Sequence, residues 1–210
     1  MGDSEDGAFR TAFFRGLKAR GLAGMQLVIS DAHTGLKAAI AAVFAGAAWQ
    51  RCRVHFMRNV LVKVPKASAD MVMAAIKTIF AQPDKDHVNE QFDEIVGMLR
   101  PKFPNVADML VGAREDLLAF RHLPEVHWRR IWSTNPLERV NGEIKRRSNV
   151  VGIFPNDSGV MRLITAVIVE QHDEWQVAEK RYLSEGSMQQ LTKSLPTAET
   201  STTMALTSQS

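Results

Sequence analysis

The 210-residue chain contains a single cysteine and no long apolar run. One cysteine excludes an internal disulfide and suits a reducing compartment. The longest apolar stretch, residues 38–48, is interrupted by Gly46 and is too short to cross a bilayer. The first residues also lack the basic and apolar segments of a secretory signal. We therefore expect a protein of the cytoplasm with no membrane partner.

Acidic residues are missing from one part of the chain. Residues 51–66 contain five Lys and Arg and no Asp or Glu, and residues 129–147 contain six basic residues against two acids. The net charge of the whole chain is only +3. Two separated basic stretches in a nearly neutral chain favour a polyanionic partner, although either stretch could also be a solvated surface.

Hydrophobic periodicity predicts a mixed α/β segment at the start of the chain. A helix is expected over 8–20, a buried strand over 25–30, a helix over 34–44 and a second strand over 47–52. This order is typical of a parallel α/β sheet, in which functional side chains collect beyond the carboxyl ends of the strands. Asp31 follows the first strand and has two explanations of equal weight, a site residue or the N-cap of the next helix. His33 could face the same pocket or only cap the helix.

The rest of the chain is predicted to be helical. Helices are expected over 56–64, 68–80, 85–99, 106–120, 136–147 and 160–175, with a loop over 148–158. Residues 187–210 are rich in Ser and Thr and predict a disordered tail. We therefore divide the chain into an α/β unit (1–55), an all-helical insertion (56–127), a unit of C-terminal helices (128–186) and the tail (187–210).

The segment 133–147 combines an acidic start with a basic end. Pro136 suits a first helical turn, and Thr134 or Asn135 can cap it. Glu138 then lies in the first turn, where the helix dipole favours the ionised carboxylate that a hard divalent cation prefers as a ligand. The alternative is a surface helix whose charges only complement its dipole. Four basic residues of this helix could bind phosphates: Arg139, Lys145, Arg146 and Arg147.

Two further patterns carry possible chemistry. Cys52 and His55 form a Cys-x-x-His pair, which could be half of a zinc site. Because the other half is missing, we favour a structural role at the end of the second strand. Trp128 and Trp132 flank two arginines and could stack on unpaired bases, but a tryptophan in a loop that enters a helix is more often a packing anchor.

Three motifs in this order resemble the Mutator family of bacterial insertion-sequence transposases. They are Ser30 to His33 after one strand, Cys52-x-x-His55 after the next, and Thr134 to Asn141 at the start of a basic helix. The resemblance runs from about Ser4 to about Leu183. It implies a fold that is α/β but predominantly helical, with a partial ribonuclease H-like core and an all-α insertion.

The resemblance also implies an activity and a set of site residues. The family uses two aspartates and one glutamate to hold Mg²⁺ or Mn²⁺, and it cleaves and joins double-stranded DNA at the transposon ends and the target by two-metal phosphoryl transfer. Asp31 matches the second aspartate and Glu138 the glutamate, so both are expected to be catalytic metal ligands. Cys52 and His55 match a signature that organises the site. Arg139 and the basic residues 145–147 would hold the DNA backbone, in the nucleoid of a bacterial cytoplasm.

The family's first aspartate has no match in this chain. In the family it lies on a strand ahead of the segment that corresponds to residues 5–7, and Asp3 and Asp6 are poor substitutes because they precede the first helix in a loop. We therefore expect an N-terminally truncated transposase that is inactive alone and that self-associates or pairs with full-length transposase. The alternatives are a non-catalytic DNA-binding or transposase-inhibiting fragment, and a metal-dependent nuclease that uses Glu143 as a third acidic ligand.

Overall fold

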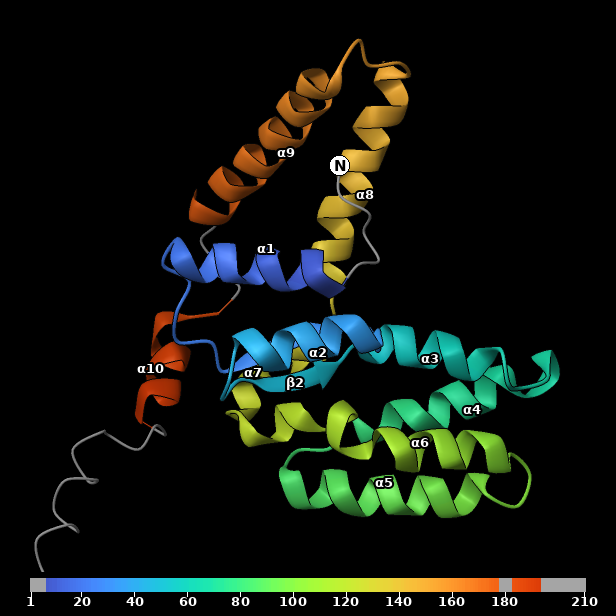
Figure 1. The fold of residues 1–210 in the computed structure, drawn as a ribbon. Coiled ribbons are helices and arrows are strands. Elements are labelled where there is room, and N and C mark those ends of the chain that lie inside the picture. The colour runs from blue at the N-terminus through green and yellow to red at the C-terminus, as the bar shows by residue number, and fades with distance from the viewer. Residues whose placement is uncertain (1–6, 178–182, 194–210) are drawn as a thin grey trace, which may run out of the picture.

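The computed structural model describes residues 7–177 and 183–193, and this part of the chain is predominantly helical (Figure 1). Its first elements are α1 (Gly7–Ala19), β1 (Leu27–Ser30), α2 (Thr34–Val43) and β2 (Ala48–Arg51). The two strands pair in parallel, as the sequence predicts. The expected α/β, mostly helical fold class is therefore confirmed. The ribonuclease H-like core stays a prediction.

Helices α1 and α2 cover one face of the two-stranded sheet. Val28 and Trp49 are directly opposite each other in the parallel register and lie on the same face, because side chains alternate along a strand. Gly46 ends the turn before β2 with a φ of 92°, a conformation that favours glycine. Three buried side chains at the end of α2 form the core on this face: Ile40, Val43 and Phe44.

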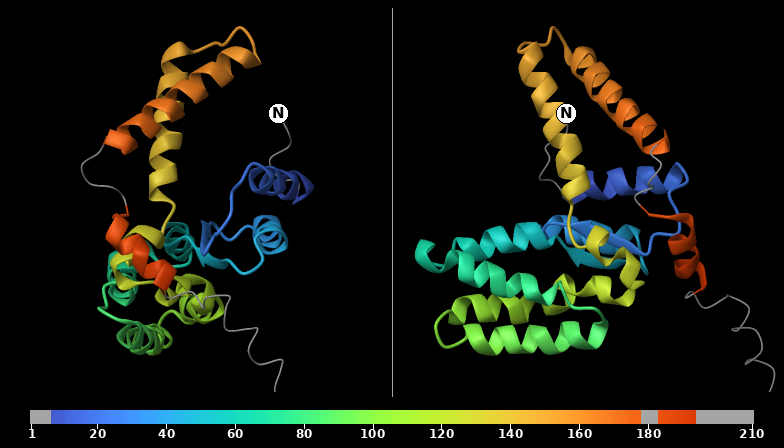
Figure 2. Two further views of the ribbon diagram at one scale, coloured as in Figure 1. Left: turned by 90° about the vertical axis from the view of Figure 1, so that its left-hand side faces the viewer. Right: turned by 180° about the vertical axis from the view of Figure 1, so that it is seen from behind.

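An all-helical unit packs against the other side of the sheet (Figures 1 and 2). It contains α3 (Arg53–Leu61), α4 (Lys66–Ile79), α5 (Lys85–Leu99), α6 (Pro104–Leu117) and the short 3-10 helix η1 (Ala119–His122). One continuous apolar cluster, from Phe56 to Trp128, forms its core. The observed bounds of α5 equal the predicted ones. Helix α3 starts earlier than expected because β2 ends at Arg51 and Cys52 alone separates it from the first helical turn, as the N-cap residue.

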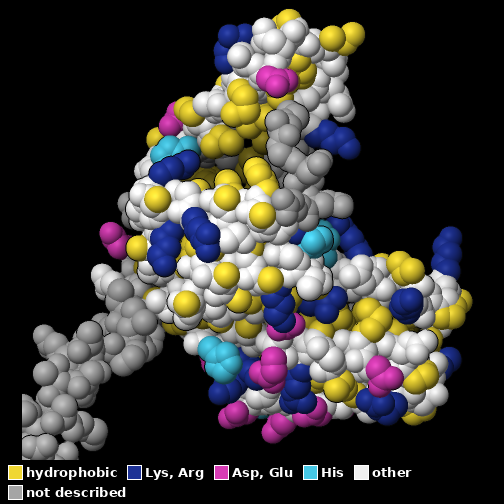
Figure 3. Space-filling view, in the orientation of Figure 1, with side chains coloured by type: hydrophobic (Ala, Val, Ile, Leu, Met, Phe, Trp, Pro, Cys, Tyr) yellow, Lys and Arg dark blue, Asp and Glu magenta, His cyan; other side chains and the backbone are white. Residues whose placement is uncertain are grey.

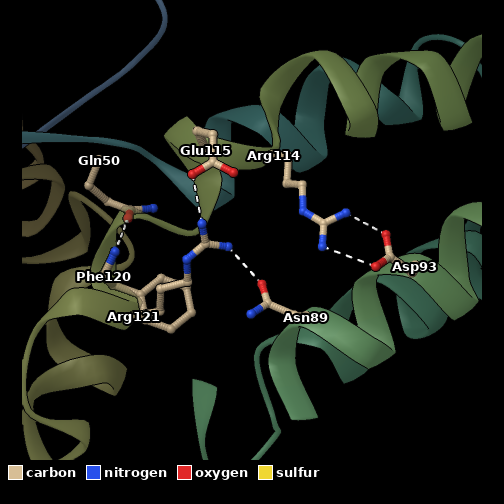
Figure 4. Close-up of polar contacts among 7 residues, drawn as sticks. All are labelled: Gln50, Asn89, Asp93, Arg114, Glu115, Phe120 and Arg121. Carbon is tan, nitrogen blue, oxygen red and sulfur yellow. Dashed lines mark hydrogen bonds and ion pairs between the residues drawn. The ribbon is translucent and has the colours of Figure 1, made fainter. Parts of the chain in front are cut away.

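Gln50 joins the sheet to this helical unit (Figure 4). Its side chain is completely buried. The amide nitrogen donates to the carbonyl oxygen of Leu117 at 2.7 Å, and the amide oxygen accepts from the backbone N–H of Phe120 at 2.8 Å. Nearby, Arg121 bonds Asn89 and Glu115, and Arg114 pairs with Asp93. Polar side chains therefore fix β2 on α6 and η1 and hold α5 to α6.

The remaining helices are α7 (Glu125–Ile131), α8 (Asn135–Val151), α9 (Asp157–Val177) and α10 (Glu185–Lys193). Helices α8 and α9 form an antiparallel hairpin that projects from the body, whereas α10 lies beside α7 (Figures 1 and 2). No residue of α8 is buried, and α9 buries only Val167 among the residues described. The hairpin is therefore held mainly at its base and by contacts between its own two helices. None of the helices in the described ranges is both long and apolar enough to span a bilayer.

Three predictions about this region differ from the structure. Trp128 lies within α7 and not in a loop. The helix that carries Glu138 continues to Val151, beyond the predicted end at residue 147, and stops where Gly152 adopts a φ of 76°. Residues 187–193 of the expected tail belong to α10. The expected N-terminal loop (1–6) and the rest of the tail (194–210) lie outside the described residues.

Candidate active site

The carboxyl end of β1 positions Asp31. The Ser30 hydroxyl donates to the Asp31 carbonyl oxygen at 2.9 Å and accepts from the indole N–H of Trp49 at 2.8 Å. The backbone of the next strand holds the same point, since the Cys52 N–H donates to the Ser30 carbonyl oxygen at 2.7 Å. Asp31 itself is exposed. It is not a helix cap, because α2 starts at Thr34 and has His33 as its N-cap residue.

Cys52 connects the end of β2 to the segment before α8. The thiol is completely buried, and its sulfur lies 3.4 Å from both the hydroxyl oxygen and the backbone nitrogen of Thr134. The Arg53 N–H also donates to the Trp132 carbonyl oxygen at 2.9 Å. Burial by itself would raise the pKa of the Cys52 thiol, but hydrogen bonds from Thr134 and His55 outweigh it, and the pKa is lowered.

Glu138 follows directly from this junction. Its backbone N–H donates to the Thr134 carbonyl oxygen at 3.0 Å, which closes the first turn of α8. The prediction that the Thr134 side chain caps α8 is wrong, because its hydroxyl contacts the Cys52 sulfur instead. One Glu138 carboxylate oxygen lies 3.6 Å from Nε2 of His55, an ion-pair distance that is attractive when the imidazole is protonated. The structure thus brings His55 and Glu138 together.

The described donors suit a hard cation better than zinc. Asp31 and Glu138 are exposed carboxylates, the ligand type that Mg²⁺ prefers, and Mg²⁺ is often held by one or two carboxylates with water and substrate phosphates completing its shell. Cys52 is buried against Thr134, and His55 faces Glu138. In the ranges that the structure describes, no group of three His, Cys, Asp or Glu side chains is arranged to hold a metal.

Glu143 has a different environment from Glu138. Its carboxylate accepts from Arg146 at 2.7 and 2.8 Å and from Arg147 at 2.7 Å. Hydrogen bonds from these two guanidinium groups hold its pKa down to about 2. Arg147 also pairs with Glu170 of α9 at 2.6 Å. Glu143 is therefore engaged within the hairpin, and the nuclease alternative that needs it as a third metal ligand loses its support.

Comparison with known proteins identifies the family. Residues 1–178 match the model of the Mutator family of transposases. The chain belongs to this family. It is 51% identical over 180 residues to the transposase for insertion sequence element IS1081 of Mycobacterium tuberculosis, an alignment that covers 86% of this chain and 43% of that protein.

Two further Mutator-family relatives give the same result. The transposase for ISRM5 of Rhizobium meliloti is 40% identical over 168 residues, which are 80% of this chain and 42% of that protein. The transposase for IS256 in transposon Tn4001 of Staphylococcus aureus is 39% identical over 176 residues, or 83% and 45%. The Mutator-family chain described here spans less than half the length of these relatives.

The basic side chains of this Mutator-family chain are unevenly distributed. Residues 7–20 contain four Lys and Arg and no acid. Blue side chains are visible over α1, whereas magenta carboxylates gather over α5 and α6 among Lys and Arg side chains (Figure 3). Of the predicted DNA-binding residues, Arg139, Lys145 and Arg146 are exposed and Arg147 is partly buried. Arg146 and Arg147 are already paired with carboxylates of the hairpin.

Sequence patterns did not identify two residues that build the site of this Mutator-family chain. Besides its place in the motif Thr134 to Asn141, Thr134 was assigned only a capping role, but it is the contact through which the Glu138 segment reaches Cys52. Gln50 lies in the predicted strand 47–52, where no role was assigned to it, but it anchors β2 to the helical unit. A glutamine within a predicted strand is the one available signal, because an amide that the fold buries requires hydrogen-bond partners.

Proposed function

We propose that this chain supplies Asp31 and Glu138 to the metal site of a Mutator-family transposase that cleaves DNA and transfers its strands. The proposal rests on the family and on one observation. A continuous set of hydrogen bonds runs from the strand end before Asp31, through Cys52 and Thr134, to the first turn of Glu138. The backbone segments that carry Asp31 and Glu138, which are far apart in the sequence, are therefore joined through one hydrogen-bonded junction.

The chemistry of the junction suits phosphoryl transfer. A Mg²⁺ or Mn²⁺ ion held by such carboxylates polarises a phosphate oxygen and favours formation of the attacking hydroxide or alkoxide. Asp31 and Glu138 would supply two of its ligands. His55 would position the Glu138 carboxylate, since its Nε2 lies 3.6 Å from one oxygen of that group. Both carboxylates are exposed, so a DNA phosphate can approach them from solvent.

The basic face of α8 would hold the DNA backbone beside these carboxylates. Arg139 is the residue directly after Glu138, and Lys145 lies two turns further along the same helix. Contacts to phosphates are independent of sequence and weaken with salt. Recognition of particular transposon ends therefore requires other contacts, and we assign none of them to α8.

Metal-dependent thermal stability tests the carboxylates without requiring activity. If Mg²⁺ or Mn²⁺ binds the folded chain with a Kd of about 1 mM, 10 mM metal should stabilise it by roughly 1.4 kcal/mol, a rise in Tm of about 3–6 °C. Asp31→Asn and Glu138→Gln should each abolish most of this rise. Glu90→Gln, an exposed carboxylate on α5, is the matched control and should retain it.

A DNA nicking assay on element-end DNA, with the same variants, then tests the chemistry and the expected inactivity of the chain alone. A metal-dependent rise in Tm that survives both substitutions would contradict the proposed ligands. If the chain binds DNA but neither metal nor the two substitutions change its Tm or its nicking activity, the result would instead support the second function, DNA binding without cleavage.

A further inference from the structure

A second candidate site lies beside the Cys52 junction. A pocket of about 450 Å³ opens between α3, the end of α4 and α7. Ligand pockets commonly measure about 300–1,000 Å³, so this one can admit a single nucleotide. Its walls combine aromatic rings with three basic side chains and one acid, Glu125. The principal lining residues are Arg53, Lys77, Phe80, Trp128, Arg129 and Trp132.

Arg53 is the most unusual group in this pocket. Its guanidinium carbon lies 4.1 Å from the ring centroid of Trp132 and 5.0 Å from that of Phe80. Its Nε atom is buried and has no hydrogen-bond partner among the described residues. No carboxylate in the described ranges forms an ion pair with it, and burial lowers its pKa. A guanidinium that is partly desolvated without an anion is costly, and an anionic ligand would remove that cost.

Two exposed cations extend this charge to the mouth of the pocket. Lys77 comes from the last turn of α4 and Arg129 from the last turn of α7, and both side chains are solvent-exposed. Glu125 is the one acidic residue that lines the pocket, against three basic residues, so the net charge of the pocket is positive. The aromatic wall lies beside these cations: Trp132 is only partly buried, whereas Trp128 is buried. Positive charge next to an accessible aromatic ring is how proteins bind unpaired nucleotides, with the base stacked and the phosphate neutralised.

We propose that this pocket binds an unpaired nucleotide of a DNA strand, with its phosphate at Arg53, Lys77 and Arg129 and its base against Trp132. The proposal rests on the proposed function, in which DNA is the substrate. The backbone joins the two sites, because the Arg53 N–H donates to the Trp132 carbonyl oxygen and Arg53 directly follows Cys52. The pocket thus lies beside the junction that carries Asp31 and Glu138. It would hold a strand that leaves the duplex next to the reacting phosphate.

Binding of labelled oligonucleotides to the full chain in EDTA tests this proposal. The probes are a fluorescein-labelled 20-nucleotide single strand and the corresponding duplex, measured by anisotropy over a salt series. Lys77→Gln combined with Arg129→Gln should weaken single-strand binding at least about tenfold. It should also reduce the slope of log affinity against log salt by about 1.4, since each phosphate contact to a single strand contributes roughly 0.7. The matched control is Lys63→Gln combined with Lys66→Gln, which also removes two positive charges, from exposed positions at and just before the start of α4.

Trp132→Phe tests the base separately from the phosphate. It keeps an aromatic ring in the core but reduces the stacking surface, so single-strand affinity should fall at least about threefold while duplex affinity stays unchanged. The oligonucleotide should quench tryptophan fluorescence in the wild type and quench it less in this variant. Thermal melts of every variant establish that the chain remains folded.

Three results would overturn the proposal. The first is equal affinities and salt slopes for Lys77→Gln/Arg129→Gln and the control Lys63→Gln/Lys66→Gln. The second is an equal loss of single-strand and duplex binding in Trp132→Phe, and the third is fluorescence quenching in Trp132→Phe that equals that of the wild type. Because EDTA removes divalent metal, failure of the proposed metal site would leave these measurements unaffected, and the two proposals can fail independently.

Discussion

Replacing Gln50 by Leu should destabilise the chain strongly, although the two side chains have similar volumes. The substitution removes the amide that donates to Leu117 and accepts from Phe120. Both backbone groups then lie unpaired in a region where the wild-type side chain is completely buried. An unsatisfied buried group costs about 1–3 kcal/mol. Allowing for the apolar gain of the leucine, we expect the free energy of unfolding to fall by about 2–4 kcal/mol.

Urea denaturation followed by circular dichroism measures this loss, with Gln176→Leu as the control. Gln176 is exposed on α9, so its substitution should change the free energy of unfolding by no more than about 0.5 kcal/mol. A chain of this size should lose roughly 5–15 °C in Tm for Gln50→Leu. A loss below about 1 kcal/mol, or one equal to that of the control, would refute the reasoning. It would mean that Gln50 does not couple the sheet to the helical unit.

Two further predictions concern single groups. Because Arg146 and Arg147 hold the pKa of Glu143 at about 2, below its ordinary 4.5, this carboxylate stabilises the folded chain above pH 4.5 and loses that contribution as the pH falls towards 2. Thermal melts should therefore show a smaller acid-induced loss for Glu143→Gln than for the wild type, and equal losses would contradict the ion pairs. Cys52 is the single cysteine and is completely buried, so a thiol reagent should react with the folded chain at least about ten times more slowly than with the urea-unfolded chain. Thr134→Ala should raise the rate at which the reagent modifies Cys52 in the folded chain. An unchanged rate would show that Thr134 does not shield the Cys52 thiol.

Local patterns sufficed for most helices and for both strands. Helix α5 was predicted with its correct bounds because its apolar side chains recur at helical spacing. In the structure, the Asp84 side chain caps this helix by accepting hydrogen bonds from the N–H groups of Asp86 and His87. Helix α7 was missed because seven residues are too few to establish a period. Helix α8 was predicted too short because its basic residues suggested a C-terminal turn, whereas the chain has no helix-breaking residue between Arg147 and Gly152.

The candidate site could be predicted only in pieces. The sequence suggests Asp31 by the strand before it and Glu138 by its place in the first turn of a helix, and neither pattern carries information about the distance between them. The contact of Thr134 with Cys52 depends on how the helical unit folds back onto the sheet, which is a property of tertiary packing. The packing explanation of Trp128 was correct, since this ring is buried edge-on against Phe120 at 5.0 Å. The pocket beside Trp132 needed the three-dimensional arrangement of α3, α4 and α7.

The position of α8 would allow one helix to join the proposed chemistry to the proposed DNA binding. Its first turn is tied to the body through Thr134, and Glu138 lies in that turn. The rest of the helix has no buried residue and is held by α9, with Arg147 paired to Glu170. Since an α-helix rises 1.5 Å per residue, Lys145 lies about 10 Å beyond Glu138, or roughly three base pairs of DNA. The body thus fixes the carboxylate while the hairpin carries the basic residues. A substitution at the junction should therefore affect metal binding, and one along the hairpin should affect the salt dependence of DNA binding.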